Sequence, residues 1–270
     1  MIVPIVGLGV LLALALMFIP HQQPAFVGGS LSFHQAVDAG PLPDLSGERD
    51  IVRRKTRFFE YLLPLVQAEN HRLADIRQRL LYIQERIRFG CELDSDDQVW
   101  LGEVLVEFRM MDRQMTDEPF WPEILKRADQ LPENLVLVQA ANESAWGTSR
   151  FASEGNNLFG QWCFSPGCGM VPEGRPQGET YEVARFKSVP HAIAAYMRNL
   201  NSGHAYDKLR EIRAQLRLEG HPVTAVDLVD GLTRYSERGE DYISELLAML
   251  RVNAPLIDEI RSAGPGKPEA

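Results

Sequence analysis

This sequence contains few cysteines and histidines and has no excess of positive charge. Each of these features excludes a class of protein. Its 270 residues include three Cys and six His, and these lack the paired spacing used for zinc. We therefore expect neither a metal nor another cofactor. Lys and Arg number 28 against 37 Asp and Glu, which gives a formal net charge of −9. Such a chain lacks the basic excess that neutralises nucleic-acid phosphates, so a nucleic-acid partner is disfavoured.

Charge is also absent from the first twenty residues. At about 1.5 Å per residue a helix of this length crosses a ~30 Å hydrocarbon core, so residues 1–20 are predicted to be a membrane or export segment. They lack a basic start and a clear cleavage site, although Val27-Gly28-Gly29 leaves cleavage open. An uncleaved anchor in the cytoplasmic membrane is preferred, with the body in the periplasm. Residues 21–45 are rich in Pro, Gly and Ser and are predicted to be a linker.

The remaining chain is mostly helical in its pattern. In residues 46–115 apolar positions recur at helical spacing before and after Asn70, and a third helix is expected from Ser95, which serves as its cap. We predict a helical N-terminal region here with a packing role, a main domain over residues 116–260 and a disordered tail over 261–270. Within the main domain, helices are expected near 190–200, 205–218, 224–232 and 242–252, and residues 178–186 are expected to form a β-hairpin.

The segment with the most chemical content is 138–162. A helix that begins after Pro132 is apolar nearly all round and ends at Glu143, and Gly147 follows where a left-handed cap is usual. The carboxyl group is therefore held at the end of a rigid helix. It faces a loop, residues 156–162, whose amide and aromatic side chains suit a sugar.

Two motifs in this segment resemble a known family. Glu143-Ser144-x-Trp146-Gly147 followed by Asn157-Leu158-Phe159-Gly160 resembles the glucosaminidase domain of bacterial autolysins and flagellar-rod peptidoglycan hydrolases, most closely in its Bax-type members. The resemblance covers about residues 121–210. It implies a mainly α, lysozyme-like helical domain with a small β-lobe, and hydrolysis of β-linked N-acetylglucosamine in peptidoglycan, which would be the main partner.

Glycosidic cleavage requires a proton donor, usually with a second acidic group opposite. Glu143, packed against Trp146 and the helix core, would be partly desolvated, which favours a neutral general acid. The resemblance implies that a Thr-x-Glu stretch supplies the second carboxylate, and Thr180-Tyr181-Glu182 matches it. Glu179 is the runner-up, because residues three apart on a strand point to opposite faces.

Further residues are predicted to contact the sugar. The resemblance implies that the Tyr206 hydroxyl lies across from the acid and bonds the substrate acetamido group. Phe159, Trp162 and Phe164 are a sugar-stacking set, with Trp162 assigned to the groove and Phe159 to the core. Asn157 is expected either to bind sugar or to hold the loop backbone. Trp146 and Glu179 complete the predicted substrate-binding set.

The cysteines are predicted to divide into one bonded pair and one free thiol. Cys163 and Cys168 are separated by four residues that include Pro166 and Gly167, and no second pair completes a metal site. Outside the cytoplasm such a pair is expected to form a disulfide. Cys91, at a helix end, is expected to be a small buried hydrophobe.

Two other functions share most of these features. A lytic transglycosylase acts on the same glycan with one glutamate and needs no second carboxylate. A non-catalytic envelope scaffold would bind glycan without turnover. The product separates hydrolysis from transglycosylation, and glycan binding without turnover would indicate the scaffold.

Overall fold

The structure, a computed structural model, describes residues 39–264. The predicted anchor, most of the predicted linker and the end of the tail lie outside the described residues. Within 39–264, no helix combines the length and the apolar character needed to cross a membrane. The elements are α1 Ile51–Arg88, α2 Ser95–Glu107, α3 Phe120–Arg127, α4 Glu133–Glu143, α5 Arg150–Gly155, β1 Trp162–Cys163, β2 Gly169–Met170, β3 Glu182–Ala184, α6 Val189–Ser202, η1 His204–Tyr206, α7 Asp207–Leu218, α8 Ala225–Val229, η2 Asp230–Leu232 and α9 Glu240–Ala263.

Helix α1 is a single helix of 38 residues, where the sequence suggested two stretches divided at Asn70. The Asp50 carboxylate caps it by accepting bonds from the amides of Val52 and Arg53. Asn70 is buried and bonds both the N–H and the C=O of Leu131, at 3.0 and 2.8 Å. Asn70 therefore holds the segment that leads into α4, and it does not end α1.

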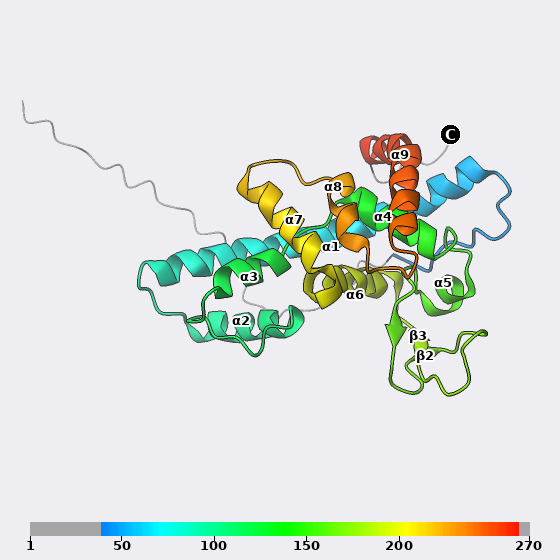
Figure 1. The fold of residues 1–270 in the computed structure, drawn as a ribbon. Helices are drawn as coiled ribbons and strands as arrows, with labels where there is room; N and C mark the ends of the chain where they lie inside the picture. Colours follow the sequence, from blue (N-terminus) through cyan, green and yellow to red (C-terminus); the bar gives the residue numbers. More distant parts are fainter. Residues whose placement is uncertain (1–38, 265–270) are drawn as a thin grey trace, which may run out of the picture.

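One hydrophobic core crosses the predicted boundary at residue 115. Helix α1 packs against α4, α6 and α9, and apolar residues from α1, α4 and α9 belong to the same buried cluster. Leu45, at the end of the predicted linker, is part of this cluster too. The upstream helices are thus part of the body that supports the site (Figure 1).

A buried ionic cluster joins α1, α7 and the end of α3. The carboxylate of Asp129 accepts two bonds from Arg217, at 2.5 and 2.7 Å, and lies 3.6 Å from the Nε of Arg213 and 3.8 Å from Arg77. Arg213 also donates to the carbonyls of Lys126 and Gln130. Asp129 and Arg213 are almost completely removed from water, so breaking this cluster would leave a buried charge without its counter-charge.

The β-structure differs from the expected hairpin within residues 178–186. Only β3 forms there, and it is the central strand of a three-stranded antiparallel sheet ordered β1-β3-β2. A Cβ at Gly169 would lie 2.0 Å from the carbonyl oxygen of Val183, so β2 approaches β3 too closely for any other residue. The partners of β3 therefore come from the cysteine segment before it.

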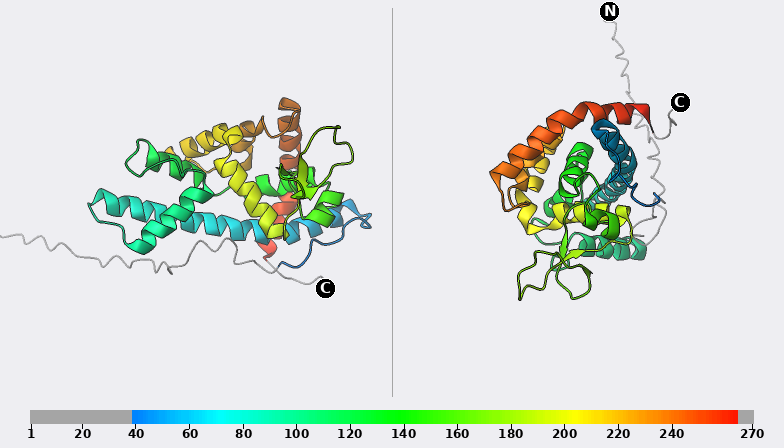
Figure 2. Two further views of the ribbon diagram at one scale, coloured as in Figure 1. Left: turned by 90° about the horizontal axis from the view of Figure 1, so that it is seen from below. Right: turned by 90° about the vertical axis from the view of Figure 1, so that its right-hand side faces the viewer.

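The sheet and its loops project from the helical body, while α2 and α3 lie at the opposite end of the molecule (Figure 1; Figure 2). The mainly helical architecture with a small β-lobe is confirmed. The expected later helices are present, but α9 continues to Ala263, so the first residues of the predicted tail are helical. The cap of α2 is Asp94 rather than Ser95.

Candidate functional site

The turn after α4 explains the first motif. Ala145, Trp146 and Gly147 all have positive φ, at 51°, 60° and 77°, an unusual backbone for the first two. The buried Ser144 holds this turn, because its hydroxyl donates to the Ala140 carbonyl at 2.6 Å and accepts from the Gly147 amide at 2.7 Å. The Trp146 amide bonds the Ala141 carbonyl at 2.9 Å. The motif therefore fixes the direction in which the chain leaves the carboxyl group of Glu143.

Trp146 packs against α1. Its ring meets those of Phe58 and Phe59 edge-on, with centroids 5.7 and 5.4 Å away, and the Lys55 ammonium lies 4.9 Å from its centroid. These contacts give Trp146 a packing role on the upstream helix. A direct contact with sugar stays a prediction.

The second motif builds the loop that faces the helix end. The Asn157 side chain is 1% exposed; it donates to the carbonyls of Gln161 and Ala184 and accepts from the amides of Phe159 and Gln161. Of its two proposed roles, the structure shows loop support. Phe159 is 2% exposed and stacks on Tyr196 with centroids 4.0 Å apart. Its assignment to the core is confirmed, and its predicted place among the substrate-binding residues stays a prediction.

Gly160 brings the two motifs together. A Cβ added to this exposed residue would lie 3.6 Å from the Oε2 atom of Glu143, so the loop backbone passes directly beside the carboxyl group. The Tyr242 hydroxyl donates to the Oε1 atom at 2.9 Å, and the Asn142 amide is 3.5 Å from it. Glu143 is only partly exposed, and burial raises the pKa of its carboxyl group, while the bond from Tyr242 acts in the opposite direction. This arrangement favours a carboxyl group that keeps its proton above the usual pH range.

A polar network behind Glu143 was missed at the level of sequence. Gln139 is 0% exposed, donates to the Tyr242 hydroxyl at 2.9 Å and accepts a bond from the Tyr196 hydroxyl. Tyr235 stacks on Tyr242, with centroids 5.6 Å apart, and donates to the Phe159 carbonyl at 2.8 Å. The feature of the sequence that could have predicted this network is Gln139. A polar side chain one helical turn before Glu143, on an otherwise apolar helix, requires buried partners.

Tyr206 is close to this network, but in the described part of the chain the tyrosine bonded to Glu143 is Tyr242. Its ring centroid is 6.1 Å from that of Tyr235. Burial raises the pKa of its hydroxyl, and the negative charge of Glu143 adds to that effect. Its predicted bond to the substrate stays a prediction, whereas the tyrosine that contacts the acid in the structure is Tyr242.

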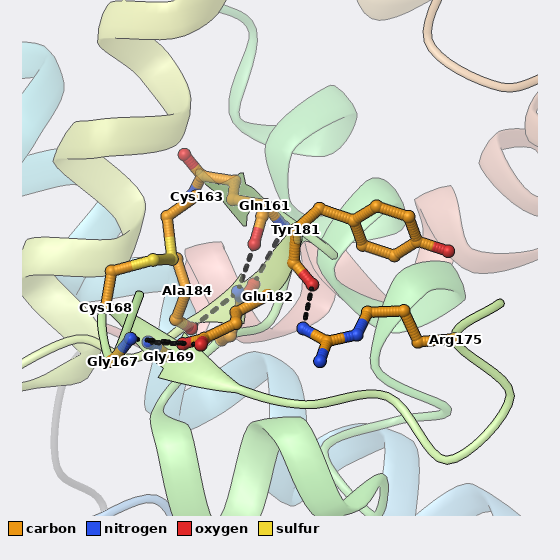
Figure 3. Close-up of a disulfide and its surroundings, with 10 residues drawn as sticks. Gln161, Cys163, Gly167, Cys168, Gly169, Arg175, Tyr181, Glu182 and Ala184 are labelled. Carbon is orange, nitrogen blue, oxygen red and sulfur yellow. Dashed lines mark hydrogen bonds between the residues drawn. A yellow bond between two sulfur atoms is a disulfide. The ribbon is translucent and has the colours of Figure 1, made fainter. Parts of the chain in front are cut away.

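Glu182 lies on β3 with its carboxylate turned toward the cysteine loop (Figure 3). Its two oxygens accept bonds from the amides of Gly167 and Gly169, at 3.0 and 2.8 Å. These bonds lower the pKa of its carboxyl group. Both oxygens are thus occupied by the backbone in this conformation, and its predicted role as a second catalytic carboxylate stays a prediction.

Cys163 and Cys168 are joined as a disulfide with Cα atoms 6.2 Å apart, as the sequence suggested. Their sulfur atoms and the Glu182 carboxylate lie within 4.8 Å of one another, but sulfurs bonded to each other are not the thiolates that bind metals. Cys91 is exposed, so the expectation that it is buried was wrong. Helix α1 ends before it, and Cys91 follows the turn instead of facing the core.

An accessible aromatic surface lies on the β-lobe. Trp162 is 55% exposed and stacks on Tyr181, with ring centroids 4.3 Å apart and planes 11° from parallel. Phe164 is also exposed. Flat rings of this kind suit stacking on a sugar, and Tyr181 is a neighbour that the sequence did not suggest; the sugar-stacking role of Trp162 and Phe164 stays a prediction. Glu179 is exposed on the same lobe, and its predicted sugar contact stays untested.

Comparisons with known proteins match the region of the chain that contains this site. The model of the family described as mannosyl-glycoprotein endo-beta-N-acetylglucosaminidase matches residues 121–253, which include Glu143, the β-lobe and Tyr242. Protein bax of Escherichia coli (strain K12) is 32% identical over 216 residues, which are 80% of this chain and 76% of that protein. No solved structure matches the chain significantly. The matched region together with the identity to Protein bax shows that this chain belongs to the glucosaminidase family.

Proposed function

We propose that this protein hydrolyses β-1,4-linked N-acetylglucosamine bonds in the glycan strands of peptidoglycan, with Glu143 as the general acid. The observation that carries the proposal is the environment of Glu143. Its carboxyl group is partly exposed, burial raises its pKa, it accepts a bond from the Tyr242 hydroxyl, and it lies beside the loop at Gly160. A carboxyl group whose protonated form is favoured by burial, and which a neighbouring hydroxyl orients, suits protonation of a glycosidic oxygen.

In this mechanism Glu143 donates its proton to the glycosidic oxygen as the bond from that oxygen to C1 of N-acetylglucosamine breaks. The electron pair of the broken bond stays with the leaving sugar. The positive charge that develops at C1 is relieved by the substrate's own 2-acetamido oxygen, and a water molecule then adds to C1 and gives a proton back to the Glu143 carboxylate. The bond from Tyr242 to Glu143 supports the carboxylate during the interval in which it is charged.

The bonds made by Glu182 favour a second candidate, a lytic transglycosylase. That reaction uses a single acid, and the Glu182 carboxylate is occupied by the amides of Gly167 and Gly169. In this alternative a hydroxyl group of the muramyl sugar attacks its own C1, and an anhydro end forms without water. Hydrolysis remains the leading proposal because the family model is that of a glucosaminidase.

The test is digestion of purified peptidoglycan, with the new ends identified by mass spectrometry. A reducing N-acetylglucosamine end supports hydrolysis, whereas an anhydro-muramyl end, lighter by one water molecule, supports transglycosylation. Glu143→Gln should reduce the rate by about 10²–10⁴-fold, because the amide keeps the shape but has no acidic proton. Glu133→Gln, on the other end of α4 in a surface ion pair with Arg261, is the matched control.

Two results would contradict the proposal. One is a Glu143→Gln variant that retains the wild-type rate, which would remove Glu143 from the reaction. The other is binding of glycan strands by the wild-type protein without any new chain ends, which is the behaviour of a scaffold.

The proposed substrate also implies a location, the outer side of the cytoplasmic membrane, with residues 1–20 as the anchor. Fractionation of cells that make the full-length protein tests this. Full-length protein found soluble in the cytoplasm, with residues 1–20 retained, would contradict both the anchor and the cell-wall substrate.

A further inference from the structure

We propose that Glu182 is a positioning residue: together with the Cys163–Cys168 disulfide it braces the loop over residues 163–169 and thereby holds the Trp162–Tyr181 ring pair in place for a sugar. We call the carboxylate and the disulfide the loop brace, and the two stacked rings the aromatic platform. The inference rests on the proposed function, since it assigns the platform to glycan binding. It gives Glu182 a role different from that of a second catalytic carboxylate.

The first part of the loop brace is a carboxylate that bonds two amides of the same loop. Gly167 and Gly169 flank Cys168, and each donates its N–H to a different oxygen of Glu182, at 3.0 and 2.8 Å. The whole residue is only 8% exposed. Hydrogen bonds from backbone amides to a charged carboxylate are stronger than those between neutral groups. The loop amides would otherwise lack this partner.

The second part of the loop brace is the disulfide, which closes the same loop (Figure 3). Cys163 on β1 is directly opposite Glu182 on β3 in the sheet register. Residues opposite one another in an antiparallel pair have side chains on the same face of the sheet. The covalent bond and the carboxylate therefore act on one face, and both end at the segment around Cys168.

The aromatic platform lies on the other face of the same strands. Trp162 precedes Cys163 and Tyr181 precedes Glu182, so their side chains point away from the loop brace. Trp162 pairs with Val183, which places Tyr181 at the diagonal position across the strands, and the rings stack with centroids 4.3 Å apart. Arg175 adds a bond to the Tyr181 carbonyl at 3.1 Å. Each platform ring is thus one residue from a brace residue.

This geometry predicts effects on binding rather than on the chemical step. If the loop brace is weakened, β1 and β3 can shift relative to each other, and the two rings no longer offer one flat surface. A stacking surface contributes to the affinity for sugar, so its loss should raise KM. A second catalytic carboxylate would instead act on kcat, by about 10²–10⁴-fold, and would change the pH profile.

The first experiment measures kcat and KM of Glu182→Gln on soluble glycan strands over a range of pH. Gly167 and Gly169 bond different oxygens of Glu182, and the amide replaces one of these oxygens by an NH₂ donor, so one glycine N–H loses its acceptor. We expect KM to rise by about three- to tenfold, the size of one aromatic stacking contact, with kcat and the shape of the pH profile retained. Glu173→Gln is the matched control, since Glu173 is an exposed carboxylate on the same lobe. A large loss of kcat with unchanged KM in Glu182→Gln would overturn the proposal.

The second experiment tests whether the carboxylate and the disulfide act on the same loop. Cys163→Ser with Cys168→Ser removes the bond, and combining these changes with Glu182→Gln completes a double-mutant cycle. Because both parts hold one segment, the effects on KM should be coupled, with the combined change differing from the product of the separate changes. Independent, multiplicative effects would mean that the two do not form one brace.

A readout without turnover separates this proposal from the proposed function. Hydrogen exchange of the amides of Gly167 and Gly169 should be slow in the full-length protein and faster in Glu182→Gln, while exchange in α4 stays unchanged. Binding of glycan strands by the inactive Glu143→Gln variant should weaken when Glu182→Gln is added. If the wild type has no enzymatic activity but these two results hold, the proposed function fails and the brace stands. Unchanged hydrogen exchange and unchanged glycan binding would contradict the loop brace without affecting the proposed function.

Discussion

Replacing Tyr242 by Phe removes one hydroxyl group that serves both the acid and the core. This hydroxyl donates to Glu143 and accepts from the buried Gln139, both at 2.9 Å. The ring itself is retained, with its stacking on Tyr235. The substitution therefore has two separable consequences, one for the titration of Glu143 and one for the stability of the fold.

The effect on titration has a definite sign. The bond from Tyr242 favours the charged form of Glu143 and lowers its pKa against the larger effect of burial. Without the bond, the pKa of Glu143 rises. A general acid is active while protonated, so the decline of kcat/KM at high pH should move to higher pH in Tyr242→Phe.

The effect on stability comes from Gln139. In Tyr242→Phe its side-chain NH₂ loses an acceptor in a position closed to water, and an unsatisfied buried donor costs about 1–3 kcal/mol. For a domain of this size, each kcal/mol corresponds to roughly 2–4 °C in Tm. We expect a loss of about 2–12 °C by these two relations.

The assay is the pH dependence of kcat/KM on soluble glycan strands, together with thermal unfolding followed by circular dichroism. Tyr235→Phe is the control: it loses a bond to the Phe159 carbonyl but no bond to Glu143. Tyr235→Phe should lower Tm without changing the pH at which kcat/KM declines. A decline that moves to lower pH in Tyr242→Phe, or one that moves equally in both variants, would refute the reasoning.

Three further results are expected. Asp129→Asn should destabilise the protein by about 3–5 kcal/mol in urea unfolding, because the buried Arg213 and its neighbour Arg217 lose their counter-charge; a change below 1 kcal/mol would mean that the backbone carbonyls alone satisfy Arg213. Burial raises the folded-state pKa of Glu143 above its unfolded value, so this carboxyl group lowers the free energy of unfolding once the pH exceeds the unfolded pKa. Glu143→Gln should therefore raise Tm at pH 7 but leave it unchanged at about pH 3, below the unfolded pKa of about 4.3, and an equal gain at both values would exclude this cause. In protein isolated from the envelope, intact-mass analysis after alkylation should show two extra labelled thiols only after reduction, and labelled Cys163 and Cys168 without reductant would exclude the disulfide.

The sequence by itself determined much of the local architecture. The apolar helix that ends at Glu143, the loop that follows Asn157, and the Cys163–Cys168 pair were all read from residue type and short spacing. These features are local, because helix periodicity and left-handed glycine positions depend on neighbours in the chain. The two cysteines are also only five positions apart, so a short turn can bring them together. The resemblance of the two motifs to the glucosaminidase family was confirmed by the family match.

Only the tertiary structure decided which side chains surround the acid and which serve the loops. Tyr242 is 99 positions from Glu143 along the chain, and no local pattern links them. Glu182 carries the same carboxyl group as Glu143, but its bonds from two backbone amides favour its charged form, whereas burial favours the neutral form of Glu143. The role of a carboxyl group depends on desolvation and on its hydrogen-bond partners, and both are set by segments that meet only when the chain has folded.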